Sequence, residues 1–286
     1  MASPYAAAPQ LTEKQFAEWR DLLEQRLGIR LNPNQRQFLQ SQVAMRMREV
    51  GEEDFGAYFR HISDGSEGKL EWAILLDRLV VKETSFFRHR PSLDAVCRHL
   101  QERINNSALS QSYDVWSLGC ASGEEPYSLA MLINESFELA RLDSQFSLTG
   151  TDVSRVAISL ARAACFSERK LQFVPPALRT KYFHQRAVNQ FHFEHEVSRR
   201  LCFNCANVLD LDVMPKLDFD VVYCQNLLIY FPQRLREKIL DEIVEKLKPG
   251  GLLVIGLGEV INWQNPRVSR INRADVQAYQ CLARAK

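Results

Sequence analysis

The chain has 286 residues, of which 46% are hydrophobic and 25% charged, and its formal net charge at pH 7 is +1. This composition is typical of a globular protein with one large or two smaller domains, and it excludes an intrinsically disordered chain. The near-zero net charge gives no support for nucleic acid as a partner. The sequence contains no run of roughly 18 uncharged apolar residues, so no membrane-spanning segment is predicted.

The first ten residues lack the basic start and long apolar run of a signal peptide, which predicts a cytoplasmic protein. The seven cysteines are odd in number and lie among apolar neighbours, as buried reduced thiols do. Only Cys202 and Cys205 form a C-x-x-C pair, and neither a second pair nor a histidine at zinc spacing follows them. We therefore predict no metal site.

Residues 1–85 predict a small all-helical domain. Thr12 and Gln15 form a capping box, and the apolar pattern that follows has helical spacing until Gly28. A second helix is predicted from Pro33 to a stop signal at Gly51, and further amphipathic stretches complete the domain.

Residues 86–286 predict a doubly wound α/β domain, because strands of the buried type alternate with helices. The strand candidates are 115–118, 146–149, 221–224 and 252–255, and the clearest helices are 126–140 and 234–247. Residues 165–202 interrupt this alternation, and the strand-like stretch 190–197 predicts an inserted antiparallel β-subdomain. His192, Glu194 and His195 could be drawn as metal ligands there, but alternation puts His195 on the opposite face, so a solvated strand face is favoured.

The segment from Leu118 to Tyr127, with the sequence LGCASGEEPY, follows a strand and opens a helix. Its glycines allow a tight turn and close backbone approach to a ligand at the end of the strand. A dinucleotide fingerprint requires a third glycine, and here Glu124 and Glu125 stand where phosphates would lie. Carboxylates attract a cation, so the motif favours S-adenosylmethionine over a nicotinamide dinucleotide.

Polar residues follow the other predicted strands. Asp152 can accept hydrogen bonds from both ribose hydroxyls, although an aspartate after a strand is often only a helix cap. The stretch 204–209 can border an adenine or form a plain turn, and 224–231 places polar side chains and a tyrosine at the ligand-binding end of the sheet. Residues 247–253 predict a tight turn from a helix into a strand. When such a turn follows the preceding motifs in this order, the combination is common in class I methyltransferases.

Three strings make the chain resemble the CheR-type chemoreceptor glutamate methyltransferases, including their pilus-linked relatives. They are Glu83-Thr84-Ser85-Phe86-Phe87-Arg88, Gly123-Glu124-Glu125-Pro126-Tyr127-Ser128 and Asn226-Leu227-Leu228-Ile229-Tyr230-Phe231, in the order and approximate spacing of the family. The resemblance spans nearly the whole chain. It implies a helical N-terminal domain joined to a seven-stranded, Rossmann-like class I methyltransferase domain with an inserted antiparallel β-subdomain.

The resemblance also implies roles for individual residues. Arg88 and Tyr230 correspond to the catalytic pair, and Phe86 and Phe87 to packing for the loop that presents Arg88. The cofactor-binding positions are Thr84, Arg88, Glu125, Asp152, Asn207, Val208, Cys224 and Gln225, and the cofactor is S-adenosylmethionine, with S-adenosylhomocysteine as product. Arg36, Arg46 and Arg48, on the second N-terminal helix, correspond to positions that bind the cytoplasmic helical region of a receptor.

The implied reaction suits these residue types. A glutamate carboxylate of the receptor attacks the sulfonium methyl and becomes a glutamyl methyl ester. Because its usual pKa is about 4.3, it is ionised at pH 7 and needs no general base. Positioning then supplies the catalysis: Arg88 offers planar charged donors, and Tyr230 offers a directional hydroxyl.

This sequence departs from the family pattern at several positions. Lys82 stands where an asparagine often contacts the cofactor, and Gln225 replaces an arginine. The stretch Gly256-Leu257-Gly258-Glu259 replaces the more usual Gly-His-Ser-Glu, a departure at Leu257 and Gly258. Gln42 and Met45 occupy helix positions that are often basic, which predicts weaker electrostatic steering of the receptor. Residues 185–190 lack the glycine-bearing insertion of relatives that dock a receptor's C-terminal pentapeptide, so no such tether is predicted.

Two other functions compete with this interpretation. A non-catalytic S-adenosylmethionine-binding adaptor would keep Glu125 and Asp152 but lose the substrate-orienting groups, and the retention of both Arg88 and Tyr230 disfavours it. An RNA methyltransferase would share the cofactor fold but add a basic, aromatic surface, which the net charge does not support.

Overall fold

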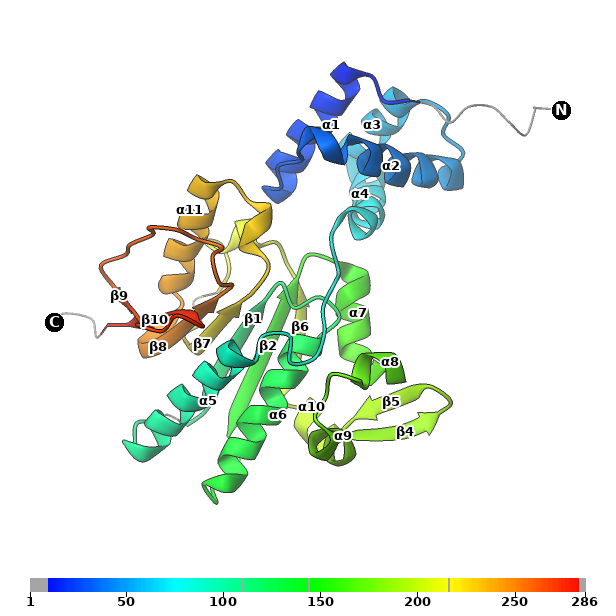
Figure 1. Cartoon of the computed structure of the whole chain (residues 1–286). Helices are drawn as coiled ribbons and strands as arrows, with labels where there is room; N and C mark the ends of the chain where they lie inside the picture. The colour runs from blue at the N-terminus through cyan, green and yellow to red at the C-terminus, as the bar shows by residue number, and fades with distance from the viewer. Residues whose placement is uncertain (1–9, 110, 144, 216, 283–286) are drawn as a thin grey trace. The chain divides into compact units, whose positions relative to one another are not determined.

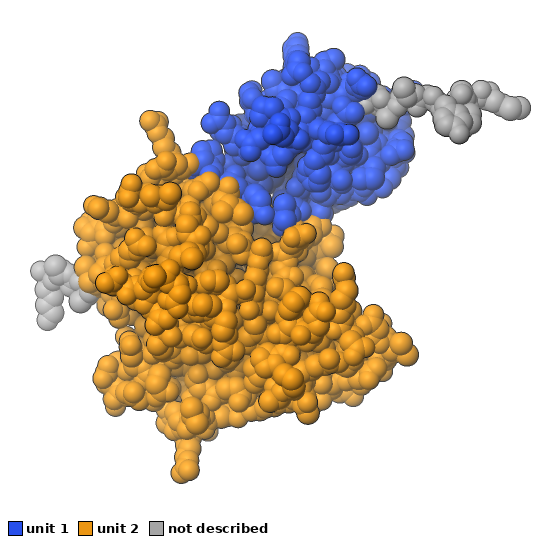
Figure 2. Space-filling model, in the orientation of Figure 1, with its two compact units in different colours: residues 1–81, 230–232 blue, residues 82–229, 233–286 orange. Residues whose placement is uncertain are grey.

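The computed structural model of this protein describes residues 10–109, 111–143, 145–215 and 217–282 (Figure 1). Most of the amino-terminal segment on which the expected absence of a signal peptide rests lies outside these ranges. The chain forms two compact units: the residues up to Val81 together with Tyr230–Pro232, and residues 82–229 together with 233–286 (Figure 2). None of the helices within the described ranges has both the length and the apolar character that a membrane crossing needs.

The first unit is helical. Thr12 caps its first helix through the predicted capping box with Gln15, and Gly28 and Gly51 end two helices in the left-handed conformation, with φ of 69° and 77°. The core forms around Trp19, whose ring stacks on Tyr58 at 6.1 Å between centroids. The elements are α1 (Glu13–Leu27), η1 (Pro33–Gln35), α2 (Arg36–Val50), α3 (Phe55–Ser63) and α4 (Gly65–Leu79).

A seven-stranded sheet with helices forms the main part of the second unit. Its strands lie in the order β6-β2-β1-β7-β8-β10-β9. The pairs from β6 to β8 are parallel and β10 pairs antiparallel with β8 and β9. The elements are α5 (Arg90–Asn105), β1 (Tyr113–Leu118), α6 (Glu124–Leu139), β2 (Phe146–Asp152), α7 (Arg155–Ala163), β6 (Leu201–Cys205), η2 (Val208–Asp210), β7 (Phe219–Cys224), α11 (Gln233–Val244), β8 (Leu247–Ile255), β9 (Val268–Arg270) and β10 (Gln277–Cys281), with η3 (Leu228–Tyr230) between β7 and α11.

The central strands are buried on both faces, which explains their continuous apolar runs. On β7, Val221 and Tyr223 belong to the core cluster formed with α5 and α6, while Val222 and Cys224, which alternate with them, are equally buried. The predicted helix–strand alternation is confirmed. The turn predicted at 247–253 is wrong: these residues belong to β8, where the pairing with β7 shifts register and Gly250 adopts a φ of 77°.

The predicted antiparallel insert is present as a separate three-stranded sheet in the order β3-β5-β4. Strand character ends at Phe193, not at Val197, because the Glu194 side chain accepts the Glu196 N–H and caps a short helix. The elements of the insert are β3 (Cys165–Phe166), α8 (Glu168–Leu171), α9 (Pro176–Tyr182), β4 (Phe183–Ala187), β5 (Gln190–Phe193) and α10 (His195–Ser198).

Candidate active site

The loop between β1 and α6 reaches the end of β2 through Asp152. One carboxylate oxygen of Asp152 accepts the Ala121 N–H at 2.9 Å, and the other accepts the Ser154 N–H at 2.8 Å. Gly119 and Gly123 have φ of 71° and 95°, and a Cβ on Gly123 would lie 3.0 Å from the Ala161 Cβ. The glycines therefore let the backbone turn closely around the Asp152 carboxylate.

Glu125 lies in the first turn of α6 and is half-buried at the same edge of the sheet. Ser117 of β1 donates a hydrogen bond to its Oε1 at 2.7 Å. Burial raises the pKa of Glu125 to about 8; the nearby charge of Glu259 raises it further, whereas the Ser117 hydrogen bond and the charge of Arg88 oppose the shift. A bound cation would favour the ionised carboxylate, so this group suits a positively charged ligand.

Glu124 differs from its neighbour, although the sequence suggested that both carboxylates face a ligand. Its side chain is fully buried and forms an ion pair with Lys170 of α8. Ser122 donates to Glu124 Oε2 at 2.7 Å and accepts from Lys170 Nζ at 2.9 Å. The expectation was therefore wrong for Glu124, which links the loop to the antiparallel insert.

The ends of β6 and β7 bring further predicted residues to this edge. Cys205 pairs with Asp152 in the sheet, and Cys224 pairs with Leu118 of β1. Asn207 follows β6 and accepts the Leu209 N–H at 3.1 Å through its side chain, which starts η2. The adjoining Val208 is buried, and burial raises the pKa of the Cys224 thiol well above its usual value.

The side chain of Gln225 hydrogen-bonds to other groups of the protein. Its amide nitrogen donates to the Ile255 carbonyl at 2.8 Å and to the Ser92 hydroxyl at 3.0 Å, and the residue is buried. Both amide hydrogens are thereby used to join β8 to α5. Its predicted contact with a cofactor stays a prediction.

The segment that carries Thr84 and Arg88 precedes α5 and is anchored by two phenylalanines. Phe86 is buried, and its ring meets those of Phe166 and Phe183 edge-on at 4.9 and 5.5 Å. Phe87 has a φ of 53° and donates its N–H to the Ser128 hydroxyl at 3.0 Å. Thr84 is half-buried, whereas Arg88 is exposed and donates to the Glu83 carbonyl at 3.1 Å.

Two family models divide the chain between them. The one described as "CheR methyltransferase, SAM binding domain" matches residues 82–277, and the one described as "CheR methyltransferase, all-alpha domain" matches residues 14–80. The chain belongs to the CheR methyltransferase family. It is an S-adenosylmethionine-dependent methyltransferase, which confirms the predicted enzyme class, fold and cofactor.

Curated relatives of this CheR-family chain match it over most of its length. It is 27% identical over 255 residues to "Chemotaxis protein methyltransferase" of Borreliella burgdorferi, covering 88% of this chain and 89% of that relative. It is 28% identical over 251 residues to "Chemotaxis protein methyltransferase 2" of Vibrio cholerae, with 87% and 86% coverage. "Probable biofilm formation methyltransferase WspC" of Pseudomonas aeruginosa is 27% identical, and the match covers 83% of this chain and 55% of that relative.

The three α2 arginines of this CheR-family chain have different surroundings. Arg46 forms a two-pronged ion pair with Glu71, with both N–O distances at 2.7 Å, and Tyr58 donates to the same carboxylate at 2.6 Å. Arg36 is bound to the Glu13 carboxylate and the Leu11 carbonyl. Arg48 is exposed. Receptor binding by these arginines stays a prediction, and Arg46 also has an internal structural role that the sequence did not reveal.

Tyr230 ends η3 and is half-buried, and its catalytic role stays a prediction. From the sequence, Glu259 is named only as part of a motif, and no role is predicted for it. Its side chain is only 3% exposed, and its carboxylate accepts the Leu228 N–H at 3.3 Å. Burial raises the pKa of Glu259 to about 7, against backbone hydrogen bonds that lower it. Among sequence signals, the Gly-x-Gly-Glu pattern after a buried strand could have pointed to this residue.

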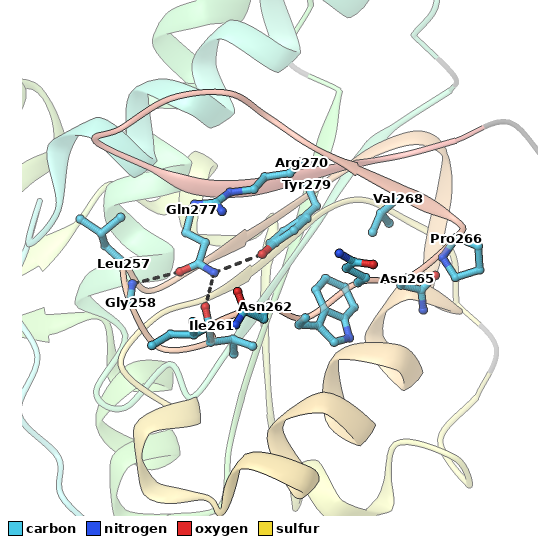
Figure 3. A pocket seen from close by; sticks show the side chains of 13 residues that line it. Leu257, Gly258, Ile261, Asn262, Asn265, Pro266, Val268, Arg270, Gln277 and Tyr279 are labelled. Atoms are coloured by element: carbon cyan, nitrogen blue, oxygen red, sulfur yellow. Dashed lines mark hydrogen bonds between the residues drawn. The ribbon is translucent and has the colours of Figure 1, made fainter.

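A cavity of about 950 Å³ lies beside the segment that follows Glu259 (Figure 3). Gln277 of β10 projects toward this segment: its side-chain oxygen accepts the Gly258 N–H at 3.0 Å, and its nitrogen donates to the Val260 carbonyl at 2.8 Å. The same nitrogen lies 3.1 Å from the Tyr279 hydroxyl. The loop from Gly258 to Val260, which lines one side of the cavity, is therefore held in place by hydrogen bonds to Gln277.

Proposed function

We propose that this protein transfers the methyl group of S-adenosylmethionine to glutamate carboxylates in the cytoplasmic helical region of a chemoreceptor. The products are glutamyl methyl esters and S-adenosylhomocysteine. The observation that carries the proposal is the match of both CheR domains, in order, to one chain that keeps Glu125 and Asp152 at the carboxyl edge of its sheet. Chemotaxis methyltransferases among its relatives support it.

The cofactor fits the residues at this edge. The Asp152 carboxylate accepts the Ala121 and Ser154 N–H groups at the carboxyl end of β2, which is where an acidic acceptor for ribose hydroxyls is expected. Glu125 supplies negative charge for a cationic ligand, and Asn207 and Val208 follow the adjacent strand. We assign these residues, with Thr84, Arg88, Cys224 and Gln225, to cofactor binding.

S-adenosylmethionine supplies a methyl group on a sulfonium sulfur. The protein's part is to bring a receptor carboxylate, already ionised at pH 7, into line with that methyl. The exposed guanidinium of Arg88 offers planar charged donors that align a carboxylate, and the Tyr230 hydroxyl offers one directional hydrogen bond. No general base is needed, so positioning provides the acceleration.

The receptor is proposed to meet α2, where Arg48 is exposed beside Met45, an exposed apolar residue. This mixed surface favours a contact with less electrostatic steering than a fully basic helix would give. Because the target lies on the cytoplasmic part of a receptor, the proposal also places the enzyme in the cytoplasm. Because the chain is also similar to a probable biofilm-formation methyltransferase, the proposal includes receptors of pathways other than flagellar chemotaxis.

No C-terminal pentapeptide tether is proposed. Strands β4 and β5 are joined through Val188 and Asn189, and Asn189 accepts the Glu168 N–H at 2.8 Å. The turn therefore lacks a long loop to receive a peptide. Titration of a receptor-tail pentapeptide into the protein should show no saturable binding, and micromolar affinity would contradict this part of the proposal.

The reaction is tested by transfer of radiolabelled methyl from S-adenosylmethionine to cytoplasmic receptor fragments of the same cell. Brief mild alkali should release the label as methanol, because glutamyl methyl esters are base-labile. Alkali-stable label would mean a different acceptor group. Cofactor binding without label on any receptor would favour the non-catalytic adaptor, and label on RNA would favour an RNA methyltransferase.

A further inference from the structure

The backbone between β7 and α11 has little regular structure of its own, yet it carries Tyr230. Asn226 adopts a left-handed φ of 56°, and a single 3-10 turn follows it. A hydroxyl that aligns reacting groups works only if this backbone is held in place, since a misplacement of about 1 Å can cost about a hundredfold in rate. The contacts that hold residues 226–229 are therefore functionally informative.

Glu259, from the loop after β8, holds this segment from one side. Its Oε2 accepts the Leu228 N–H at 3.3 Å. Gly256 makes room for the group, because a Cβ there would lie 2.3 Å from Glu259 Oε1. Among the described residues Glu259 Oε1 is buried without a hydrogen-bond partner, so the hold on the loop is made through Oε2 of an acid that is only 3% exposed.

Arg236 of α11 joins the same two loops through their carbonyl groups. One guanidinium nitrogen donates to the Glu259 carbonyl at 2.6 Å, and another donates to the Ile229 carbonyl at 3.2 Å. The planar fork thus spans the residue that anchors Leu228 and the residue directly before Tyr230. A lysine, with one ammonium group in place of the fork, cannot reproduce this geometry.

Gln277 holds the backbone on both sides of Glu259 by hydrogen bonds. Its amide bonds to Gly258 and to Val260, the residues on either side of Glu259 (Figure 3). Gln277 is buried on β10, within the sheet. A continuous set of hydrogen bonds therefore runs from the sheet to the backbone beside Tyr230.

We propose that Glu259, Arg236 and Gln277 are positioning residues for methyl transfer, which act by fixing residues 226–229 and thereby the hydroxyl of Tyr230. The inference rests on the proposed function and deepens it. It distinguishes these residues from Glu125 and Asp152, which bind the cofactor. Loosening the anchor should lower kcat and leave the affinity for S-adenosylmethionine unchanged.

The test is a double-mutant cycle between Arg236→Met and Tyr230→Phe, with kcat measured on a receptor fragment and cofactor affinity measured by calorimetry. Arg236→Met should lower kcat by about tenfold to a hundredfold in the wild-type background but by less than about threefold when Tyr230 is already phenylalanine. Single-turnover rates with enzyme in excess extend the measurement to the slow variants.

Further variants separate positioning from loss of fold. Gly256→Ala should displace the Glu259 carboxyl group and lower kcat although it removes no hydrogen-bonding group. Glu259→Gln keeps an acceptor for Leu228 and should retain more activity than Glu259→Ala. The matched control is Lys248→Met, which removes the ion pairs to Asp114 and Asp220 near the start of β8; it should lower the unfolding temperature and leave kcat unchanged.

Equal losses in both Tyr230 backgrounds would overturn the inference. So would a wild-type rate for Tyr230→Phe or Arg236→Met, or a loss found only in cofactor affinity. If the unmodified protein methylates no receptor, the proposed function fails instead. The two failures are therefore distinguishable.

Discussion

Binding of S-adenosylmethionine should release close to one proton at neutral pH, and Glu125 should supply it. Burial raises the pKa of Glu125 to about 8 in the free protein, so this carboxyl group is about nine-tenths protonated at pH 7. The cofactor carries an ammonium and a sulfonium, and a cation beside the carboxylate favours its ionised form. If the pKa returns toward its usual range in the complex, binding releases about 0.9 proton at pH 7, about 0.5 at pH 8 and about 0.1 at pH 9.

The same shift determines how cofactor affinity changes with pH. Below pH 8 the free protein holds a proton that the complex lacks, so protons compete with the cofactor and affinity rises with pH. The association constant should increase nearly tenfold, by about 1.3 kcal/mol, from pH 6 to pH 7, and level off above pH 8. For folding the sign is opposite: a carboxyl group with a raised pKa binds protons in the native state, so its contribution to stability falls between its unfolded pKa of about 4.5 and about 8.

Calorimetry from pH 6 to pH 9, in pairs of buffers with different ionisation enthalpies, measures the released protons directly. Glu125→Gln should remove most of the release and flatten the pH dependence of affinity. Glu259→Gln is the comparison variant: it removes a neighbouring charge that raises the pKa of Glu125, so it should reduce the release less than Glu125→Gln does. No release at pH 7 in the wild-type protein, or equal release in wild type and Glu125→Gln, would refute the reasoning.

Three further predictions concern single side chains. Asp152→Ala should weaken S-adenosylmethionine binding by roughly 1.5–3 kcal/mol, the range of charged hydrogen bonds, and unchanged calorimetric affinity would remove Asp152 from the cofactor site. Glu71→Ala should lower the free energy of unfolding of the first unit by about 3 kcal/mol in urea titrations, because Arg46 and Tyr58 lose their shared buried acceptor; a loss no larger than that of Glu49→Ala, at the exposed partner of Arg46, would contradict this. Lys170→Met should leave the Glu124 carboxylate buried without its cation, and so make the insert more susceptible to protease, whereas Lys170→Arg should retain resistance; equal cleavage rates for the two variants would show that the ion pair does not hold the insert.

Much of the fold was predictable because its signals are local. The Thr12 capping box, the left-handed glycines at helix ends and the runs of apolar residues act within a few positions of the chain, and each is present where the sequence indicated. The same locality explains two errors. The glycines after Lys248 look like a turn, but pairing with β7 makes them part of strand β8. Glu194 looks like part of a strand, but its side chain caps a short helix and the strand ends before it.

The position of the site could also be predicted, because parallel strands end at one edge of a sheet. Asp152 and Glu125 follow different strands, yet strand pairing brings their loops together. Their proposed role in cofactor binding rests on motifs of residue type and order, and it is supported by the match of residues 82–277 to the CheR SAM-binding domain.

The partners of the buried charges were decided only by the tertiary structure. Adjacent glutamates have the same local sequence signal, but Glu124 is paired with Lys170 and Glu125 is directed to Ser117. The sequence predicts Arg46 only as a receptor-binding cation, and packing places Glu71 beside it. These pairings join residues far apart in the chain and depend on helix rotation and on how the elements pack. A local pattern of residue types can therefore predict that a charge is present, but only the folded chain determines which group neutralises it.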